Sequence, residues 1–386
     1  MGSIMRPRPR VLHLFADWKW TGPAEPTVNL CRHLRRHGFV ADLACAAPAQ
    51  EHPQTLAAKA RERHVPPVLD FELRKGADFL SIFRDIGKLR EYIDREEVEI
   101  VHVHSSRDHY IGSRAARKAN FQPFVVRSNH TGVPLPNGFL QRRLIEHHTD
   151  AWVALSPSCM EQDARNFRLN LKHAVAVEGA VDLERFNPDR RFADVRARLG
   201  VTPDQVLACV VARAQKHRRF DILLAALEGA MRAEASLRAM ILGRGTRFDE
   251  LVRRPVRQLG IADKVFLPGY RSEDYVDYLA AADFKVFLVP GSDGSCRAVR
   301  EMMALCKPIV AARRGLLPEL VEHGRCGLVV EDTPQNLMHA ILTMARNPEL
   351  RRRMGDEALA KARERFDIER QTTEIAELYV RLAEGR

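Results

Sequence analysis

The sequence predicts two α/β domains, each a doubly wound parallel sheet of Rossmann-like type, which face each other across a cleft. Short apolar runs of strand length alternate with segments of helix length through most of the chain. This alternation is typical of parallel sheets with helices on both faces. It breaks at residues 179–188 and then restarts, and 386 residues are more than one hydrophobic core usually supports.

In the first half, apolar runs predict strands at 10–15, 39–44, 100–104, 123–127, 151–155 and 174–177. Helices are expected at 27–36, 76–95, 106–118, 140–148 and 157–166. In the second half, strands are expected at 206–211, 237–242, 264–267, 284–289 and 308–311, with helices at 220–231, 248–258, 274–281 and 298–305.

These elements place an N-terminal domain at residues 1–180 and a C-terminal domain at residues 181–369. A last helix, within 370–386, has no strand after it. We expect this helix to pack back onto the N-terminal domain at the domain junction.

Composition indicates a soluble globular protein, with 45% apolar and 29% charged residues. No apolar run approaches the roughly 20 residues needed to cross a bilayer, and no signal-peptide core follows the basic first residues. The seven cysteines lie far apart without a zinc-binding spacing, which predicts reduced thiols. We expect a cytoplasmic protein, either free or at the inner face of the cytoplasmic membrane.

The net charge of +11 predicts an anionic partner. Nucleic acid is not expected, because no aromatic residues are interleaved with the basic clusters and no nucleic-acid-binding module is recognisable. Segment 26–37 places two leucines on one helical face and Arg32, Arg35 and Arg36 elsewhere. This pattern fits a helix that lies on an anionic membrane and fits a solvated helix equally well.

Two carboxylates eight residues apart form the most informative local pattern. Asp293 lies in a turn after an apolar strand, and Glu301 lies about two turns along the helix that follows. The N–H groups at the start of that helix, from Ser295, Cys296 and Arg297, lack intrahelical partners and favour phosphate or sugar oxygens. The alternative interpretation is an acidic loop before an ordinary amphipathic helix.

Further candidate residues follow other predicted strands, where doubly wound sheets bind their ligands: Gly22, His130, Arg213, Arg218, Gly243 and Gly245. Cations at the end of a strand suit an anionic ligand better than a structural need. A loop histidine is more often simply exposed to solvent, and a pair of glycines by itself indicates only a tight turn.

In order and spacing, these segments resemble the family 4 glycosyltransferases of the GT-B fold over nearly the whole chain. Three strings carry most of the resemblance: Ile241-Leu-Gly-Arg-Gly245, Asp283-Phe-Lys-Val-Phe-Leu-Val-Pro290, and Asp293-Gly294 through Glu301-Met-Met-Ala304. They correspond to the family's Leu…Gly-x-Gly, Asp-x-Val-Phe-Leu-Pro and Glu-Gly-x6-Glu-Ala-Met-Ala patterns. Ala212-Arg213 with Arg218 stands where the family has Gly-Arg and a lysine.

The resemblance implies transfer of a sugar from a nucleotide-sugar to a glycan or lipid-linked acceptor, with retention of configuration and with neither a metal nor another cofactor. UDP is the family's commonest nucleotide. The resemblance places four residues at the reaction, His130, Asp293, Arg213 and Arg218. It places eight around the donor, Gly22, Gly243, Gly245, Gly294, Ser295, Cys296, Arg297 and Glu301.

The implied roles are chemically consistent. Arg213 and Arg218 would bind the donor diphosphate, and Glu301 would hold the ribose hydroxyls. Asp293 would bind hydroxyls of the donor sugar, and His130 would lie by the reacting centre. Two guanidinium groups and a helix N-terminus can stabilise the charge that builds on a leaving diphosphate without Mg²⁺.

Four residues depart from the family pattern. Asp293 replaces glutamate, Arg218 replaces lysine, Arg219 replaces glycine and Cys306 replaces the small glycine common after Met-Ala. The first two leave the donor sugar open, and Arg219 is expected to change the path of its loop or to project outward. Two alternatives also stay open, a GT-B nucleotide-sugar epimerase and a nucleotide-sugar or membrane-surface binding protein without catalysis.

Overall fold

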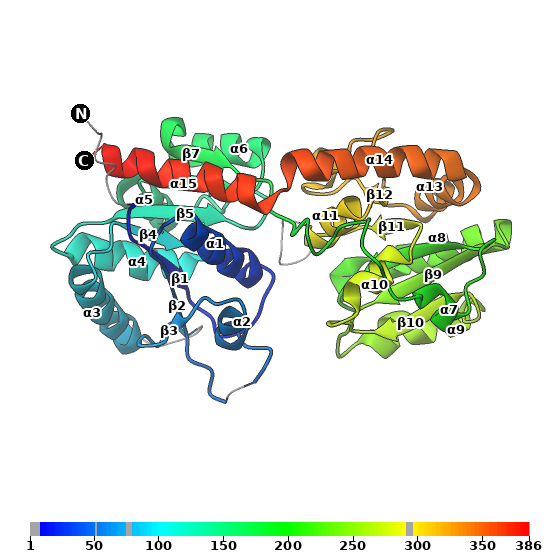
Figure 1. The fold of residues 1–386 in the computed structure, drawn as a ribbon, viewed down its shortest axis with the longest axis horizontal. Coiled ribbons are helices and arrows are strands. Elements are labelled where there is room, and N and C mark those ends of the chain that lie inside the picture. Colours follow the sequence, from blue (N-terminus) through cyan, green and yellow to red (C-terminus); the bar gives the residue numbers. More distant parts are fainter. Residues whose placement is uncertain (1–7, 51, 75–78, 291–295, 386) are drawn as a thin grey trace. The chain divides into compact units, whose positions relative to one another are not determined.

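The structure is a computed structural model that describes residues 8–50, 52–74, 79–290 and 296–385 (Figure 1). The chain divides into two compact units. The N-terminal unit comprises Met1–Gly179 and Ile368–Arg386, and the C-terminal unit comprises Ala180–Asp367.

The described part of the N-terminal unit contains a seven-stranded parallel sheet in the order β3-β2-β1-β4-β5-β6-β7. The strands are β1 (Val11–Phe15), β2 (Ala41–Cys45), β3 (Pro67–Val68), β4 (Ile100–Val103), β5 (Phe124–Asn129), β6 (Ala151–Ala154) and β7 (Ala174–Ala176). The helices are α1 (Ala24–Arg36), α2 (Leu56–Glu62), α3 (Phe79–Arg95), α4 (Ser106–Lys118), α5 (Phe139–His148), α6 (Pro157–Phe167) and α15 (Ile368–Glu384), with a 3₁₀ turn η1 (Leu171–His173).

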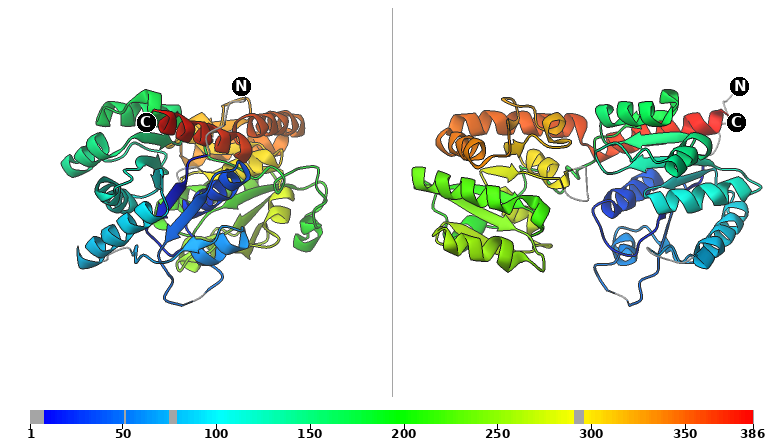
Figure 2. Two further views of the ribbon diagram at one scale, coloured as in Figure 1. Left: turned by 60° about the vertical axis from the view of Figure 1, so that its left-hand side comes forward. Right: turned by 180° about the vertical axis from the view of Figure 1, so that it is seen from behind.

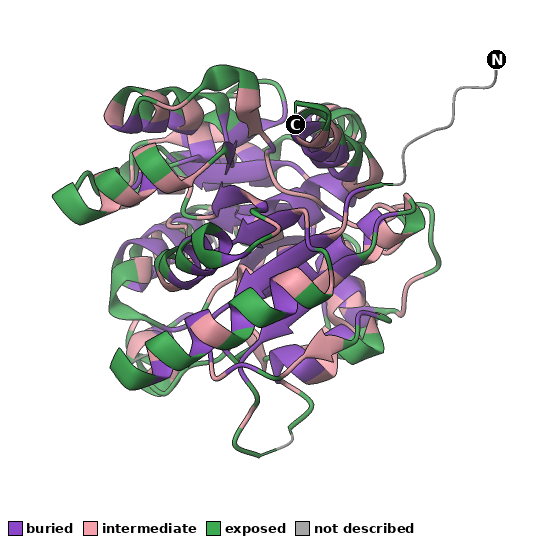
Figure 3. Ribbon diagram, turned by 90° about the vertical axis from the view of Figure 1, so that its left-hand side faces the viewer, coloured by how far each residue is buried: buried purple, intermediate pink, exposed green. Residues whose placement is uncertain are grey.

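Side chains alternate across this sheet and build a core on each face. Val11 and Phe15 pack with α1 and α15, whereas Leu12 and Leu14 pack with α3 and α4. This is the period-2 alternation expected of a strand between two layers of helices. The central strands are buried, the edge strands β3 and β7 are half-buried, and the outward faces of the helices are exposed (Figure 3).

Helix α15 ends the chain but belongs to the N-terminal unit. It lies beside α1 and β7 (Figures 1 and 2). Leu378 and Tyr379 are completely buried in the core between α15 and the sheet. The Gln371 side-chain amide donates a hydrogen bond to the Gly179 carbonyl oxygen at 2.8 Å.

The described part of the C-terminal unit contains a six-stranded parallel sheet in the order β10-β9-β8-β11-β12-β13. The strands are β8 (Val206–Val211), β9 (Leu237–Leu242), β10 (Val265–Gly269), β11 (Phe284–Phe287), β12 (Ile309–Ala312) and β13 (Gly327–Val330). The helices are α7 (Val195–Leu199), α8 (Phe220–Ala233), α9 (Arg254–Gln258), α10 (Tyr275–Ala280), α11 (Arg297–Ala304), α12 (Leu317–Leu320), α13 (Pro334–Arg346) and α14 (Pro348–Arg365), with short turns η2 (Lys216–Arg218) and η3 (Asp249–Arg253). The predicted fold class, two doubly wound parallel sheets, is confirmed.

Several elements were not expected from the sequence. β3 has only two residues and contains Pro67, so no strand pattern is visible there. The expected helix at 248–258 is divided into the π-type turn η3 and α9. Pro255 explains the division, because it has no N–H to donate to the carbonyl four residues earlier.

Helix α1 does not have the free apolar face that a helix lying on a membrane would need. Leu34 is completely buried in the unit's own core. Several basic side chains in and just after this helix also have internal partners: Arg35 bonds to Asp42, and His33, Arg36 and His37 surround Glu369 of α15. Of the two interpretations of segment 26–37, the structure favours a helix with a solvated outer face, whose apolar face packs on the unit's own core. None of the described helices combines the length and apolar character that crossing a bilayer would require.

Candidate functional site

The loops that follow β8, β9 and β11 lie together at the carboxyl-terminal ends of the strands of the C-terminal sheet, because these parallel strands are neighbours. Arg213 and Arg218 follow β8, Gly243 and Gly245 follow β9, and α11 begins after β11. Most of the residues predicted for the donor diphosphate are therefore gathered at one edge of one sheet.

Arg218 connects two of these loops. Its Nη1 donates a hydrogen bond to the Val289 carbonyl oxygen at 2.6 Å, so the half-buried side chain reaches from the β8 loop to the segment that follows β11. Arg213 is exposed. Two cations thus lie on the same loop, one held in place and one free to reorient toward an anion.

Arg219 does not need a new backbone path. Its φ of 55° lies in the left-handed region that glycine adopts readily, so the arginine follows a path that a glycine would also permit. Its Nη1 lies 3.2 Å from an Asp332 carboxylate oxygen, which accounts for the direction of the side chain.

Gly243 and Gly245 are required by backbone packing. A Cβ at Gly243 would lie 1.9 Å from the Ala212 carbonyl oxygen, and one at Gly245 would lie 2.9 Å from that of Ala214. The β8 loop also donates a hydrogen bond to the β9 loop, from the Ala214 N–H to the Arg244 carbonyl oxygen at 3.1 Å. These glycines let the β8 and β9 loops run side by side.

Glu301 is buried, at 5% exposure, and its carboxylate is held from two sides. The Tyr275 hydroxyl donates a hydrogen bond to Oε2 at 2.7 Å, and Arg297 Nε lies 3.4 Å from Oε1. Burial, with the neighbouring Glu301 charge, raises the pKa of Tyr275 well above its usual value, so the phenol stays a donor. Cys296, buried with a left-handed φ of 52°, turns the chain into α11.

Asp293, Gly294 and Ser295 lie outside the described residues. The interpretation of these three residues rests on the sequence alone.

Lys285 was missed by sequence reasoning. It lies in the middle of β11, completely buried, and its Nζ has no hydrogen-bond partner among the described residues. Burial lowers its pKa, whereas the charge of Glu301 acts in the opposite direction. Lysine is rarely buried completely, so a lysine within an apolar run was a visible signal.

In the N-terminal unit, His130 follows β5 and is half-buried. Its Nε2 lies 2.9 Å from Nδ1 of His104. The preceding residue, Asn129, donates a hydrogen bond to Asp163 at 2.9 Å, which holds this loop against α6. Gly22 lies in the turn before α1 and is half-buried.

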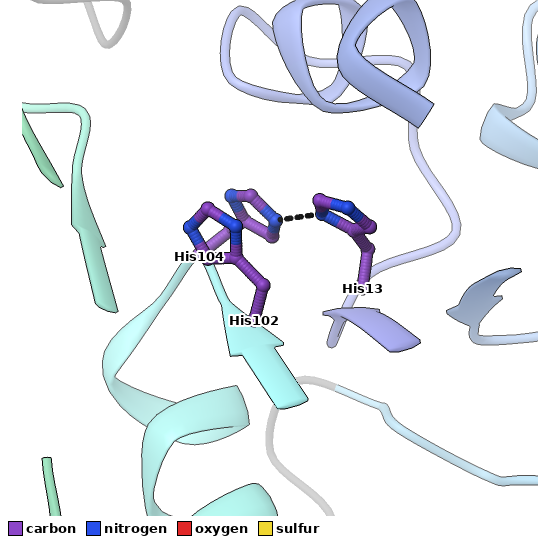
Figure 4. A group of neighbouring side chains, drawn as sticks. All are labelled: His13, His102 and His104. Atoms are coloured by element: carbon purple, nitrogen blue, oxygen red, sulfur yellow. Dashed lines mark hydrogen bonds between the residues drawn. The ribbon is translucent and has the colours of Figure 1, made fainter. Parts of the chain in front are cut away.

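His104 belongs to a histidine cluster that the sequence analysis did not identify. His13 of β1, His102 of β4 and His104 lie with one ligand atom of each within 4.8 Å of the others (Figure 4). The His102-Val-His104 spacing was the available signal, because alternate residues of a strand face the same side.

Comparison with known proteins identifies the family. The family described as glycosyl transferases group 1 matches residues 192–361, and glycosyltransferase family 4 matches residues 22–185. A D-inositol 3-phosphate glycosyltransferase from Streptomyces bingchenggensis is 26% identical over 311 residues, which is 74% of this chain and 67% of that protein.

Solved structures agree on the fold. A glycosyltransferase from Rickettsia africae superposes with a TM-score of 0.84 at 15% identity, covering 98% of this chain and 100% of that one. HepE from Anabaena, in complex with UDP, has a TM-score of 0.80 at 19% identity, covering 95% of this chain and 98% of that one. The chain belongs to the family 4 glycosyltransferases and has the GT-B fold.

Proposed function

We propose that this protein transfers a hexose-type sugar from a UDP-sugar to a glycan or lipid-linked acceptor, with retention of configuration and without a metal ion. The observation that carries the proposal is the buried Glu301 carboxylate, held by Tyr275 at the ligand-binding edge of the C-terminal sheet. Burying a carboxylate is costly. A fixed acceptor of hydrogen bonds at this edge suits the two adjacent hydroxyls of a ribose.

The diphosphate is assigned to Arg213, Arg218 and the start of α11. Arg218 is already held by the Val289 carbonyl, so its guanidinium is positioned with little further loss of side-chain entropy. Arg213 is exposed and can close on the phosphates. Fixed cations here would stabilise the charge on the departing UDP.

In the proposed reaction, an acceptor hydroxyl attacks the anomeric carbon from the face that the diphosphate leaves. The bond from the sugar to the phosphate oxygen breaks as the new glycosidic bond forms, and that phosphate oxygen takes the hydroxyl proton. Asp293 is proposed to bind the sugar hydroxyls, and His130 to lie by the reacting centre. UDP in the Anabaena neighbour supports the choice of nucleotide.

An amphiphilic acceptor is supported by apolar side chains on the N-terminal unit. Phe79, Leu80 and Phe83 begin α3, Phe139 and Leu140 begin α5, and all five are between 63% and 81% exposed. Each group has arginine close by in sequence. Exposed aromatic and aliphatic side chains beside cations suit an anionic lipid surface, which would bring the protein to the cytoplasmic face of the membrane.

The donor assignment is tested by nucleotide release in EDTA with UDP-, GDP- and ADP-sugars. We expect slow release from one UDP-sugar, at least tenfold slower in Glu301→Gln and in Asp293→Ala. Glu349→Gln, an exposed site at the start of α14, is the matched control and should keep the wild-type rate. Equal rates in all four proteins would reject the donor site. A rearranged free sugar in place of a transferred one would indicate an epimerase.

The acceptor surface is tested with vesicles of anionic phospholipid at low salt. Replacing Phe79 and Leu80 by serine should reduce sedimentation with the vesicles several-fold, whereas Leu171→Ser, at another exposed apolar site, should not. Equal sedimentation of both variants would reject this surface, and binding of neither variant nor wild type would reject membrane contact altogether.

A further inference from the structure

His13, His104 and His130 form a continuous chain of hydrogen bonds. His13 Nδ1 lies 3.1 Å from His104 Nε2, and His104 Nδ1 lies 2.9 Å from His130 Nε2. Successive rings are nearly coplanar, at 16° and 22°, with centroids 5.3 Å and 5.2 Å apart. Each centroid separation exceeds the matching N···N distance by roughly one ring diameter, so the rings meet end to end, as an N–H···N bond requires.

His102 does not belong to this chain, although it is close. Its ring stacks face to face on His104, with centroids 4.4 Å apart at 25°. Both of its nitrogens are occupied, Nδ1 by the Tyr379 hydroxyl at 2.5 Å and Nε2 by the Ser128 hydroxyl at 2.7 Å. Lone pairs lie in the ring plane, so the stacked rings of His102 and His104 do not converge on one point. The cluster is therefore a poor metal site.

The hydrogen bonds restrict where protons can lie. A neutral imidazole has one N–H and one lone pair, and each bond in the chain needs one of each. The three rings must therefore share a tautomer: either all carry the proton on Nδ1, or all carry it on Nε2.

The environment of His13, at the buried end of the row of histidines, favours one of these two tautomeric states. His13 is completely buried, and its Nε2 has no hydrogen-bond partner among the described residues. Buried N–H groups without an acceptor are rarer than acceptors without a donor. The Nδ1–H state leaves a bare lone pair at this end, whereas the other state leaves an unpaired N–H.

The environment keeps the three hydrogen-bonded histidines neutral. Burial lowers the pKa of both His13 and His130 to about 3, and the charge of the buried Arg127 guanidinium adds to the effect at His130. Asp108, the nearby carboxylate, is engaged by the backbone N–H groups of Ala16 and His104.

We propose that His13 and His104 are positioning residues that hold His130 as the Nδ1–H tautomer, so that it presents a fixed, neutral hydrogen-bond donor to the substrate. His130 Nδ1 makes no hydrogen bond to a described residue, and it is the ring nitrogen left for a ligand. In this assignment His130 orients an oxygen of the sugar or acceptor and does not act as an acid or base. Its catalytic meaning rests on the proposed function, but the tautomer does not.

The tautomer is read directly by long-range ¹H–¹⁵N NMR of the full chain with ¹⁵N-labelled histidine, with His130 assigned by its loss in His130→Gln. We expect wild-type His130 to carry its proton on Nδ1 and to show no titration from pH 8 to pH 5.5. A proton on Nε2, titration in this range, or displacement of the resonances by added Zn²⁺ would overturn the proposal.

Variants separate positioning from simple packing. In His13→Leu, His130 should no longer be restricted to the Nδ1–H tautomer. We expect kcat to fall about tenfold with little change in donor KM, the size of effect seen when a residue that orients a functional histidine is lost. His13→Asn, whose side-chain amide can donate in place of Nδ1, should restore both. Tyr379→Phe, which removes only a partner of His102, is the control and should leave the His130 signals unchanged. An unchanged His130 tautomer in folded His13→Leu would refute the coupling, whatever the activity.

Discussion

Mild acid should destabilise the N-terminal unit, because four of its histidine rings, each at most 4% exposed, are kept neutral by burial. Burial lowers the pKa of His13, His102, His104 and His109, to about 3 for His13. In the unfolded chain these rings return to a pKa of about 6.5. Below that pH the unfolded state binds more protons than the folded state, so stability falls as the pH falls, down to the folded-state pKa.

The magnitude follows from the titration of each ring. When the pH falls from 7 to 5.5, each histidine that stays neutral in the folded state but titrates normally in the unfolded state lowers the free energy of unfolding by about 1.2 kcal/mol. Four such rings together lower the free energy of unfolding by about 5 kcal/mol, which is a large part of the roughly 5–15 kcal/mol that stabilises a typical domain. Burial raises the pKa of Asp108 and Asp163, and this has the opposite sign, because the folded state then takes up protons more readily. The two carboxyls therefore reduce the loss.

The chain offers a selective probe for this transition. Its three tryptophans, Trp18, Trp20 and Trp152, all lie in the N-terminal unit, so denaturant unfolding followed by tryptophan fluorescence reports on that unit. His109→Gln, which can keep the hydrogen bond to Thr149, should lower the number of protons taken up on unfolding by about one. A difference below about 2 kcal/mol between pH 7 and pH 5.5, or an unaltered pH slope in this variant, would refute the reasoning.

Three further predictions concern stability and the donor site. Gly87→Ala, where an added Cβ meets nothing within 4 Å, should stabilise α3 by up to about 1 kcal/mol; Gly355→Ala, whose Cβ would lie 2.4 Å from the Cys306 carbonyl oxygen, should cost about 1–3 kcal/mol in thermal melts. Lys285→Met should raise Tm, and the wild type should regain stability relative to the variant as the pH rises toward 10, because burial lowers the pKa of the lysine. A Tm of Lys285→Met equal to or lower than that of the wild type at pH 7 would indicate that the Lys285 ammonium group has an unrecognised partner. Tyr275→Phe should weaken UDP binding about tenfold, because one hydrogen bond to a carboxylate is lost, and calorimetry with unchanged affinity would contradict the role of Glu301.

Much of the fold was predictable because strand and helix periodicity is local. The strands around His13 and Lys285 and the helix that carries Glu301 have clear patterns. The exceptions include short or interrupted elements, such as β3 with Pro67 and the segment divided at Pro255, where periodicity has too few residues to register. The long helices α13 and α14 were also not predicted, although their length is ample for a helical pattern.

The candidate site was less predictable than the fold. The sequence placed Arg218 at the end of a strand, but the Val289 carbonyl that holds its guanidinium lies 71 residues away. It also identified Gly243 as part of a ligand loop, whereas a Cβ at that position would strike the backbone of Ala212. Such close approaches depend on how neighbouring strands are aligned, which local sequence does not encode.

By itself, the sequence determined the fold class, the family and which residues follow the strands, because each depends on patterns within a few turns of the chain. Only the tertiary structure decided which of these residues act together. His13 meets His104 across 91 residues because β1 and β4 are parallel neighbours in register. Tyr379 meets His102 across 277 residues because the last helix returns to cover that face of the sheet. A hydrogen bond needs its partners within about 3 Å, and only the packed strands and helices bring such distant residues that close.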